Sequence, residues 1–570
     1  MSSRIILGFS LPCFVGRGVM LFLSWGWGEV MGNAQVLLVW HIVRWGRWRW
    51  EFPLILDFFS FFFRGVVFLI SFFVFLFSAS YMRQEAFFKR FGNLVILFLL
   101  SIQALIFIPH LFFLLLGWDG LGLRSFLLVI YYNNAKRLRS GLITLAYNRL
   151  GDVFFLILVS LLLKEGSWIP FFRGRREAKI VRVFLILAAI TKSAQIPFRA
   201  WLPAAMAAPT PVSALVHSST LVTAGVFLTI RFHELVFSHW WIRNLIFFIS
   251  SLTTLLAGLC ALKEFDLKKI IALSTLSNLG IIIRICRLGF IELAFFHLVV
   301  HALFKALLFI RAGYLIDEYS HSQDLRFIGD VFSRFPMIRV SFLIANGALC
   351  GLPFLAGFYS KDLLLERGFF FFSSFLILAT YYFGLFLTVL YSLRVIRTCI
   401  WARRNFSPLR EGNQGNLLFY LPLRGLTAAR ITLGAFLSRK IGDLQGEVII
   451  DFQRKMLVMG RILIALRLMY FFKFLIRYPF FNNIKTTFMG LRFRRLFFLR
   501  VIRGQLKLPF FAGRGIKVLK EVDSGWIEIS MPKLSFVFFK VSLLKINILR
   551  RRRGFNLVYG FFLIVAISLL

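Results

Sequence analysis

The segment Thr191-Lys192-Ser193-Ala194-Gln195-Ile196-Pro197 places a lysine inside an apolar run and ends that run with a proline. A charged side chain at the centre of a membrane costs about 2.5–3.5 kcal/mol, so a buried lysine is expected to have a function. The alternative is a lysine near a helix end whose long side chain reaches the headgroup region. Polar residues elsewhere in the chain supply partners for Lys192 and favour the functional interpretation.

The composition is that of a polytopic membrane protein. The 570 residues are 59% hydrophobic, include 73 phenylalanines and have a mean hydropathy of +0.79, more apolar surface than a soluble core buries. We predict an all-α membrane protein with roughly 14–16 transmembrane helices, each long enough for a hydrocarbon layer of about 30 Å. The clearest spans cover about 54–79, 93–116, 141–163, 181–196, 212–231, 244–262, 293–315, 339–358, 369–393 and 555–570.

The formal net charge of +43 is the most unusual feature of the composition. Basic clusters such as Arg550 to Arg553 are typical of loops on the positive-inside face of a membrane, so we expect the lipid bilayer to be their partner. Nucleic-acid binding is the alternative, but the charges are interleaved with membrane spans, which disfavours it.

The chain has few of the residues that hold redox cofactors. Its five cysteines form no C-x-x-C pair, and no glycine-rich nucleotide fingerprint lies between a strand and a helix. We therefore expect no cofactor and no metal in this chain. The first 23 residues are apolar but show no convincing small-residue cleavage site, so we also expect no cleaved targeting signal.

Ionisable residues recur at membrane depth. Asp119 is the one acid of an apolar helix, and Asn148-Arg149-Leu150-Gly151-Asp152 is expected to open the next helix. Arg149 and Asp152 are three residues apart, so they share a helix face and can form an ion pair of purely structural value. His217 follows in an apolar run, where a lone histidine is usually a satisfied core residue.

A second group carries a stronger signal. Lys268 precedes a helix with a polar stripe, and the following helix has His297, His301 and Lys305 at intervals of four residues. This spacing places the last three side chains on one helix face. Three titratable groups stacked along one buried face favour a path for protons.

Two apolar runs are broken by proline and glycine, each close to a lysine. The first break follows Lys192, and the second, Gly351 to Phe358, precedes Lys361 and Asp362. Interrupted helices at matching positions are typical of transporters built from inverted repeats. Unwound backbone is tolerated at that depth because it lines a polar interior.

Several motifs closely resemble the chain 5 family of mitochondrial NADH–ubiquinone oxidoreductase, respiratory complex I. The likeness is collinear from about Asp57 to Asp362 and thins beyond about residue 400. The motifs are Gly117-Trp118-Asp119-Gly120-Leu121-Gly122, Tyr147-Asn148-Arg149-Leu150-Gly151-Asp152, Lys192-Ser193-Ala194-Gln195-Ile196-Pro197, Ala207-Ala208-Pro209-Thr210-Pro211-Val212-Ser213-Ala214-Leu215-Val216-His217, His301-Ala302-Leu303-Phe304-Lys305-Ala306 and Gly357-Phe358-Tyr359-Ser360-Lys361-Asp362.

The resemblance implies a proton-pumping subunit with an antiporter-like core of two inverted five-helix repeats containing discontinuous helices. It implies N-terminal transmembrane helices in 1–92, the core in 93–400, a divergent transmembrane region in 401–521, and a lateral helix with a final span in 522–570. In this family an acid pairs with a lysine on a broken helix, and Asp119 and Lys192 match them. The other pathway residues implied by the resemblance are Arg149, Asp152, His217, Lys268, His297, His301, Lys305, and the terminal pair Lys361 and Asp362.

The same resemblance implies the cellular setting. Partners would be other complex I membrane-arm subunits, especially the neighbouring antiporter-like subunit, in the mitochondrial inner membrane. NADH, flavin, iron–sulfur clusters and ubiquinone would be used elsewhere in the complex. Two alternatives remain: a cation/proton antiporter subunit of the Mrp type, and a structural strut whose polar residues only satisfy one another.

The sequence departs from the family in three respects. Asp119 stands where many relatives carry the longer glutamate, and Pro532 interrupts the start of the predicted lateral helix at about 527–549. Arginines such as Arg284, Arg287 and Arg311 stand where similar sequences carry serine or another small residue. Invertebrate mitochondrial codes read AGA and AGG as serine, so these arginines indicate a mistranslated code, whereas Arg149 matches the family.

Overall fold

The computed structural model describes residues 36–45, 48–164, 179–329, 331, 336–353, 355–371, 375–401, 417–445, 460 and 462–467. Every structural statement below concerns these residues. The predicted lateral helix, the final span at 555–570 and residues 522–570 as a whole lie outside them, and the domain boundaries stay predictions.

Helices make up nearly all of the described structure. Nine of them, counted among the described residues, are long and apolar enough to cross a membrane. The helices are α2 (Phe58–Tyr81), α3 (Phe88–Phe107), α4 (Leu111–Ile130), α5 (Ala135–Lys164), α6 (Lys179–Lys192), α7 (Trp201–Ala205), α8 (Thr210–Val212), η2 (Ser213–Thr220), α9 (Leu221–Arg231), α10 (His233–Val236), α11 (Trp240–Ala261), α12 (Leu267–Arg287), α13 (Ile291–Glu318), α15 (Pro336–Cys350), α16 (Ala356–Phe371), α17 (Phe375–Ile396), η3 (Arg397–Trp401) and α18 (Leu417–Gln445).

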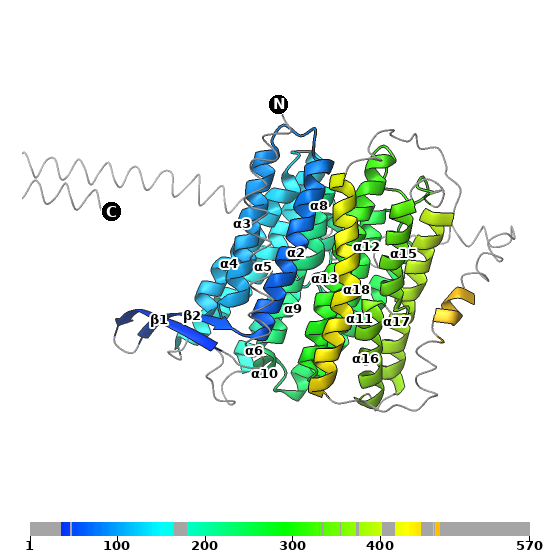
Figure 1. The fold of residues 1–570 in the computed structure, drawn as a ribbon. Coiled ribbons are helices and arrows are strands. Elements are labelled where there is room, and N and C mark those ends of the chain that lie inside the picture. The colour runs from blue at the N-terminus through cyan, green and yellow to red at the C-terminus, as the bar shows by residue number, and fades with distance from the viewer. Residues whose placement is uncertain are drawn as a thin grey trace, which may run out of the picture. The chain divides into compact units, whose positions relative to one another are not determined.

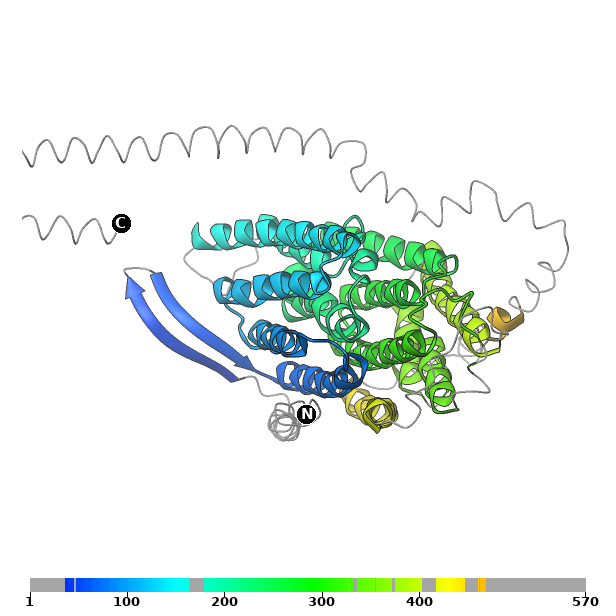
Figure 2. The same cartoon turned by 90° about the horizontal axis from the view of Figure 1, so that it is seen from above.

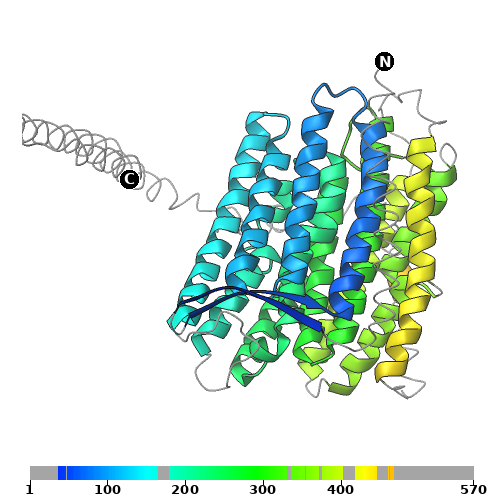
Figure 3. The same cartoon turned by 60° about the vertical axis from the view of Figure 1, so that its left-hand side comes forward.

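The long helices run side by side as a bundle with α13 at its centre (Figures 1 and 2). Helix α13 packs against α2, α12, α15, α16, α18 and η2, and its most apolar 18 residues are all buried. Fewer than half of the corresponding residues of α4 and α5 are buried, so these two helices form part of the periphery. Helix α18 lies beside α2 and also contacts α13 (Figures 1 and 3).

Both predicted helix breaks are confirmed. Helix α6 ends at Lys192 and α7 begins only at Trp201, while α15 ends at Cys350 and α16 begins at Ala356. The second break depends on Gly357, because a Cβ atom there would lie 1.9 Å from the carbonyl oxygen of Ala348. A glycine lets the two backbones approach at this point.

Three boundary predictions are wrong. The span at 93–116 joins the end of α3 to the start of α4, because Pro109 cannot continue a helix. The span at 339–358 runs through the break after Cys350. Residues 148–152 lie in the middle of α5 and do not open it, since α5 begins at Ala135.

The described structure also contains a β-hairpin that the sequence analysis did not predict. Strands β1 (Val36–Trp45) and β2 (Trp48–Leu56) pair antiparallel and extend away from the helices (Figure 2). Strand β1 contains three valines and two tryptophans, and β2 contains two tryptophans, a phenylalanine and an isoleucine, residue types that fit a pleated surface. Phe52 of β2 packs edge-on against Phe113 of α4, with ring centroids 5.0 Å apart, and ties the hairpin to the bundle.

Candidate functional site

Lys192 is the last residue of α6 and is fully buried. Its Nζ donates a hydrogen bond of 2.7 Å to the backbone carbonyl of Trp118 in α4 and lies 4.6 Å from the centroid of the same indole ring. A lysine enclosed by protein in this way does not reach the headgroup region. The alternative of a lysine that extends to the membrane surface therefore does not fit the structure.

The acids beside Lys192 are bound by an arginine. Arg149 of α5 forms ion pairs with Asp119 of α4 at 2.9 Å and with Asp152, one turn along α5, at 3.3 Å. The predicted pairing of Arg149 with Asp152 is thus confirmed. Among the described residues, no ion pair joins Lys192 to Asp119. Instead, Asp119 binds Arg149, and Lys192 binds the backbone carbonyl of Trp118.

The close approach of α5 to α6 depends on a small residue. At Gly151, directly before Asp152, an added Cβ atom would lie 2.4 Å from the hydroxyl oxygen of Thr191. Glycine therefore lets α5 reach the end of α6, where Lys192 follows Thr191. The sequence motif around Arg149 thus supplies both the charges and the space that the lysine requires.

His217 lies in η2, a stretch of π-helix between α8 and α9. The hydroxyl groups of Ser218, Ser219 and Thr220 donate to backbone carbonyls four or five residues earlier in the chain. Such back-bonding competes with regular helix geometry, and π-helical turns are frequent at functional sites. The imidazole is fully buried, with its centroid 6.4 Å from the ring of Trp201 in α7.

The three predicted pathway residues of α13, His297, His301 and Lys305, are all fully buried. Lys305 Nζ donates to the hydroxyl of Ser274 in α12. His297 Nδ1 lies 3.0 Å from the hydroxyl of Ser360 in α16. The α13 residues thereby connect α12 to the second broken helix.

The remaining predicted residues lie at the two ends of this stretch. Lys361 is buried and donates to the carbonyl of Leu349 and, at 3.5 Å, to the hydroxyl of Thr388 in α17. Asp362 beside it is half-buried. Lys268 is buried at the start of α12 and donates a hydrogen bond of 3.2 Å to the carbonyl of Ala208.

Several buried polar atoms along this route make no hydrogen bond to any described residue. They are both ring nitrogens of His217, both ring nitrogens of His301, Nε2 of His297, and the amide nitrogen and oxygen of Asn278. Buried polar groups are nearly always satisfied by protein or by ordered water. Ordered water is therefore the expected partner of these atoms.

The structure adds partners that the sequence analysis did not single out. Trp118, Ser360 and Thr388 contact the predicted lysines and histidine, although their types alone attract no attention in an apolar chain. Trp118 could be suspected because it precedes Asp119. Across the described ranges, no group of three or more His, Cys, Asp or Glu residues could hold a metal ion.

Family models match consecutive parts of the chain. The model for complex I chain 5 N-terminus matches residues 40–92. The NADH:quinone oxidoreductase/Mrp antiporter transmembrane model matches residues 109–388, and the NADH dehydrogenase subunit 5 C-terminus model matches residues 391–570. The two terminal models favour complex I over the Mrp alternative.

Known proteins are similar to this chain over most of its length. The chain is 40% identical over 509 residues to NADH-ubiquinone oxidoreductase chain 5 of Lumbricus terrestris, an alignment that covers 87% of each chain. It is 42% identical over 486 residues to the chain 5 of Anopheles gambiae, covering 83% of this chain and 82% of that one.

Solved structures share the fold. A chain of the Mrp complex from Dietzia sp. superposes with a TM-score of 0.69 at 22% identity, covering 96% of this chain and 62% of that one. A chain of the membrane-bound sulfane sulfur reductase, an archaeal respiratory membrane complex, superposes with a TM-score of 0.66 at 21% identity. The match covers 75% of this chain and 91% of that one. At these identities the likeness shows an antiporter-like fold. Taken with the family models and the relatives, it means that the chain belongs to the family of NADH–ubiquinone oxidoreductase chain 5, the antiporter-like membrane-arm subunits of respiratory complex I.

Proposed function

We propose that this membrane-arm subunit carries protons through the buried polar residues that run from Asp119 to Lys361. The observation that carries the proposal is Lys192, a fully buried lysine at the end of a broken helix, beside two acids and an arginine. Nearby charges decide whether a buried lysine holds or releases its proton. A rearrangement of these neighbours therefore moves a proton.

Arg149 supports a switch between two arrangements. In the structure Asp119 is bound to Arg149, while Lys192 rests on the carbonyl of Trp118. Transfer of Asp119 from Arg149 to Lys192 would stabilise the charged ammonium, and its return would favour release of the proton. Asp152 would keep Arg149 in place during this exchange, because it holds the same guanidinium nitrogen.

Beyond Lys192, the proposed path depends on water. His217, Asn278 and His301 offer buried polar atoms that no described residue satisfies. Water at these atoms would carry protons from Lys192 to Lys305, with Lys268 as a further carrier on α12. From His297, His301 and Lys305 of α13, protons would pass through the contact of His297 with Ser360 to the exchange site at Lys361 and Asp362.

We further propose that this chain itself holds no redox centre. NADH, flavin, iron–sulfur clusters and ubiquinone would be bound by other subunits, whose electron transfer drives the rearrangement at Lys192. The animal relatives, such as the Lumbricus chain 5, support a place in the mitochondrial inner membrane.

The exposed face of α4 and α5 supports a protein neighbour on that side. The side chains of Asp119 and Arg149 are 32% and 44% exposed on this chain, at membrane depth. Charges at this depth face protein or water and avoid lipid. The face is otherwise apolar, with exposed Leu116, Leu123, Leu127, Leu150, Val153 and Leu156. We propose that the neighbouring antiporter-like subunit covers it.

The substitution Lys192→Met in the complete complex tests the proposed function. Methionine keeps most of the volume but cannot carry a proton. With the complex in sealed vesicles, we expect NADH-driven proton translocation to fall about a hundredfold, the lower end of the range for a lost acid–base group. The matched control is Lys136→Met, an exposed lysine in the first turn of α5.

The outcome separates the pump from a structural strut. A strut predicts that Lys192→Met leaves both the amount of assembled complex and its proton translocation unchanged. That result would overturn the proposal. Reduced translocation in a fully assembled complex, with Lys136→Met at the original rate, supports it.

A further inference from the structure

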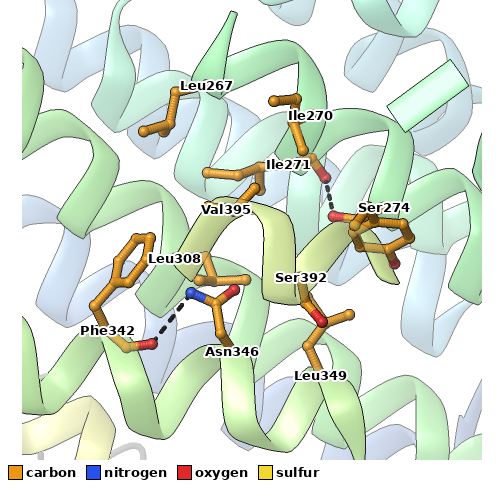
Figure 4. Close-up of a pocket in the computed structure, with 11 residues that line it drawn as sticks. Leu267, Ile270, Ile271, Ser274, Leu308, Phe342, Asn346, Leu349, Ser392 and Val395 are labelled. Carbon is orange, nitrogen blue, oxygen red and sulfur yellow. Dashed lines mark hydrogen bonds between the residues drawn. The ribbon is translucent and has the colours of Figure 1, made fainter. Parts of the chain in front are cut away.

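A small cavity lies between α12, α13, α15 and α17, away from Lys192 (Figure 4). Its volume of about 10 Å³ is close to the minimum that holds one water molecule. The lining residues are Leu267, Ile270, Ile271, Ser274, Leu308, Phe342, Asn346, Leu349, Tyr391, Ser392 and Val395.

The cavity has an apolar outer end and a polar inner end. Leu267 is the first residue of α12 and Val395 lies near the end of α17, so these side chains stand at one end of their helices. Ser274 is two turns deeper along α12, and Ser392 and Asn346 lie towards the inner end (Figure 4). The four polar lining residues are Ser274, Asn346, Tyr391 and Ser392. A purely apolar cavity of this size would stay dry, but this one has the two to four polar partners that a water molecule needs.

The polar inner end contacts the proposed proton path. Ser274 accepts the hydrogen bond from Lys305 and donates its own proton to the carbonyl of Ile271 at 2.7 Å. Tyr391 is joined to the same helix, because its hydroxyl lies 3.2 Å from that of Ser277. A hydroxyl that lines the cavity is therefore the direct partner of a buried lysine.

The outer end lies next to a charged turn between α11 and α12, because Leu267 directly follows Asp266. Asp266 precedes α12 and pairs with Lys269. Burial raises the pKa of Asp266, but Lys269, Asp324 and Lys136 together bring it below its usual value, so the carboxylate is ionised at neutral pH. Arg394 of α17 donates a hydrogen bond of 2.8 Å to the carbonyl of Glu264 in the same turn. Charged groups of this kind mark a water-facing end of the helices.

We propose that this cavity holds one water molecule that delivers protons to Lys305 from the aqueous side of the α11–α12 turn. The inference rests on the proposed function, because it needs Lys305 to be a proton carrier. The apolar residues at the outer end, Leu267, Phe342 and Val395, restrict the route to a narrow passage and limit leakage. Ser274 is the relay between the water and the lysine.

The relay step conserves protons and charge. An excess proton on the cavity water passes to Ser274 Oγ as the hydroxyl's original O–H bond breaks. The released proton forms a new N–H bond with the neutral Nζ of Lys305. The products are a neutral water, an unchanged serine hydroxyl and a charged lysine, whose ammonium then donates to Oγ as the structure has it.

The test replaces Ser274 in the intact complex. Ser274→Ala removes the relay hydroxyl, so we expect proton translocation in vesicles to fall about a hundredfold while the complex still assembles. Ser274→Thr restores a hydroxyl at the same position and should recover most of the rate. The matched control is Ser341→Ala, a buried serine of α15 that bonds its own helix at Ile338 and does not line the cavity.

A second variant tests the water directly. Asn346→Leu has nearly the same volume but removes a polar partner of the water, so it should slow translocation. Electron cryo-microscopy of the complex should show a water in the cavity of the original chain and an empty cavity in this variant. This variant also decides the question if Ser274→Ala does not assemble.

The two proposals fail in different ways. If Lys192→Met slows translocation but Ser274→Ala and Asn346→Leu leave it unchanged, the cavity is a packing gap and the proposed function stands. If the cavity holds no water in the original complex, the inference is also overturned. If Lys192→Met has no effect, the proposed function itself fails.

Discussion

At the residue scale, cations at membrane depth differ in whether the fold supplies partners. Arg149 has two carboxylates, Lys192 a carbonyl and an indole face, and Lys305 a hydroxyl. Arg311 of α13 and Arg430 of α18 are also fully buried, yet none of their guanidinium nitrogens has a hydrogen-bond partner among the described residues. Burial of a charge without a partner costs several kcal/mol. These two arginines therefore conflict with their surroundings.

Arg284 and Arg287 of α12 each donate one side-chain hydrogen bond and have no carboxylate partner among the described residues. The fully buried Arg284 donates to Thr254 at 2.7 Å, but its Nε and one terminal nitrogen have no partner in the described chain. Arg287 donates to Asn244 at 2.8 Å. A serine at such positions would be neutral and would bond to a carbonyl of its own helix. We therefore propose that residues 284, 287, 311 and 430 are serine in the protein as it is synthesised.

The codons at these four positions of the gene test the proposal. Similar chains come from the invertebrates Lumbricus terrestris and Anopheles gambiae. Invertebrate mitochondrial codes read AGA and AGG as serine. We expect AGA or AGG codons at positions 284, 287, 311 and 430, and a CGN codon at Arg149, which has its carboxylate partners. Trypsin digestion followed by mass spectrometry gives an independent measurement, because trypsin cleaves after arginine and not after serine. CGN codons at 311 and 430 would contradict the proposal.

At the element scale, the broken helices place backbone carbonyls where lysines need partners. The carbonyl of Leu349, next to the end of α15, accepts from Lys361 across the second break. The end of α6 likewise leaves Lys192 at the point where α4 and α5 approach it. Pro197 and the glycines around Pro353 are the sequence features that stop the helices, and the lysines gain their contacts from the interruptions.

The element-scale prediction concerns the glycine in the second break. Gly357→Ala would place a Cβ atom 1.9 Å from the carbonyl oxygen of Ala348, a backbone atom that cannot move aside alone. Overpacking of this kind costs about 1–3 kcal/mol or more. We expect a clear loss of assembled complex, measured on native gels. The control is Gly92→Ala in α3, where a Cβ atom would meet nothing within 4 Å. Equal amounts of both variants would show that the break tolerates a methyl group.

At the scale of the whole molecule, the described helices expose two different apolar faces. Helices α12 and α13 are almost wholly buried, whereas α4 and α5 expose an apolar face with two half-exposed charges in it. Helix α11 also exposes apolar residues such as Phe248, but its described residues include no acid that could form an ion pair there. The two faces therefore predict different neighbours, protein for the first and lipid for the second.

Cysteine substitution distinguishes the two faces in the assembled complex. Leu150→Cys on α5 should be protected from a lipid-dissolved thiol reagent and should cross-link to a neighbouring subunit. Phe248→Cys on α11, the matched exposed position, should react readily and should not cross-link. Equal labelling of both cysteines would show that lipid covers the α4–α5 face.

The sequence predicted much of the fold, for identifiable reasons. Apolar runs and their interruptions are local, so the helices, both breaks and the shared face of His297, His301 and Lys305 followed from the pattern. The start of α5 was missed because a charged segment, Ala135 to Arg139, continues into the membrane helix. The hairpin was missed because its alternation is hidden in an aromatic, hydrophobic stretch.

The sequence by itself determined the class of protein, the broken helices and which ionisable residues stand at membrane depth, because hydropathy and proline or glycine act along the chain. Only the tertiary structure decided which groups meet. It paired Asp119 with Arg149, placed Lys192 on the carbonyl of Trp118, and set Ser274 between Lys305 and a cavity. These contacts join helices far apart in the sequence, and their distances depend on how closely the bundle packs.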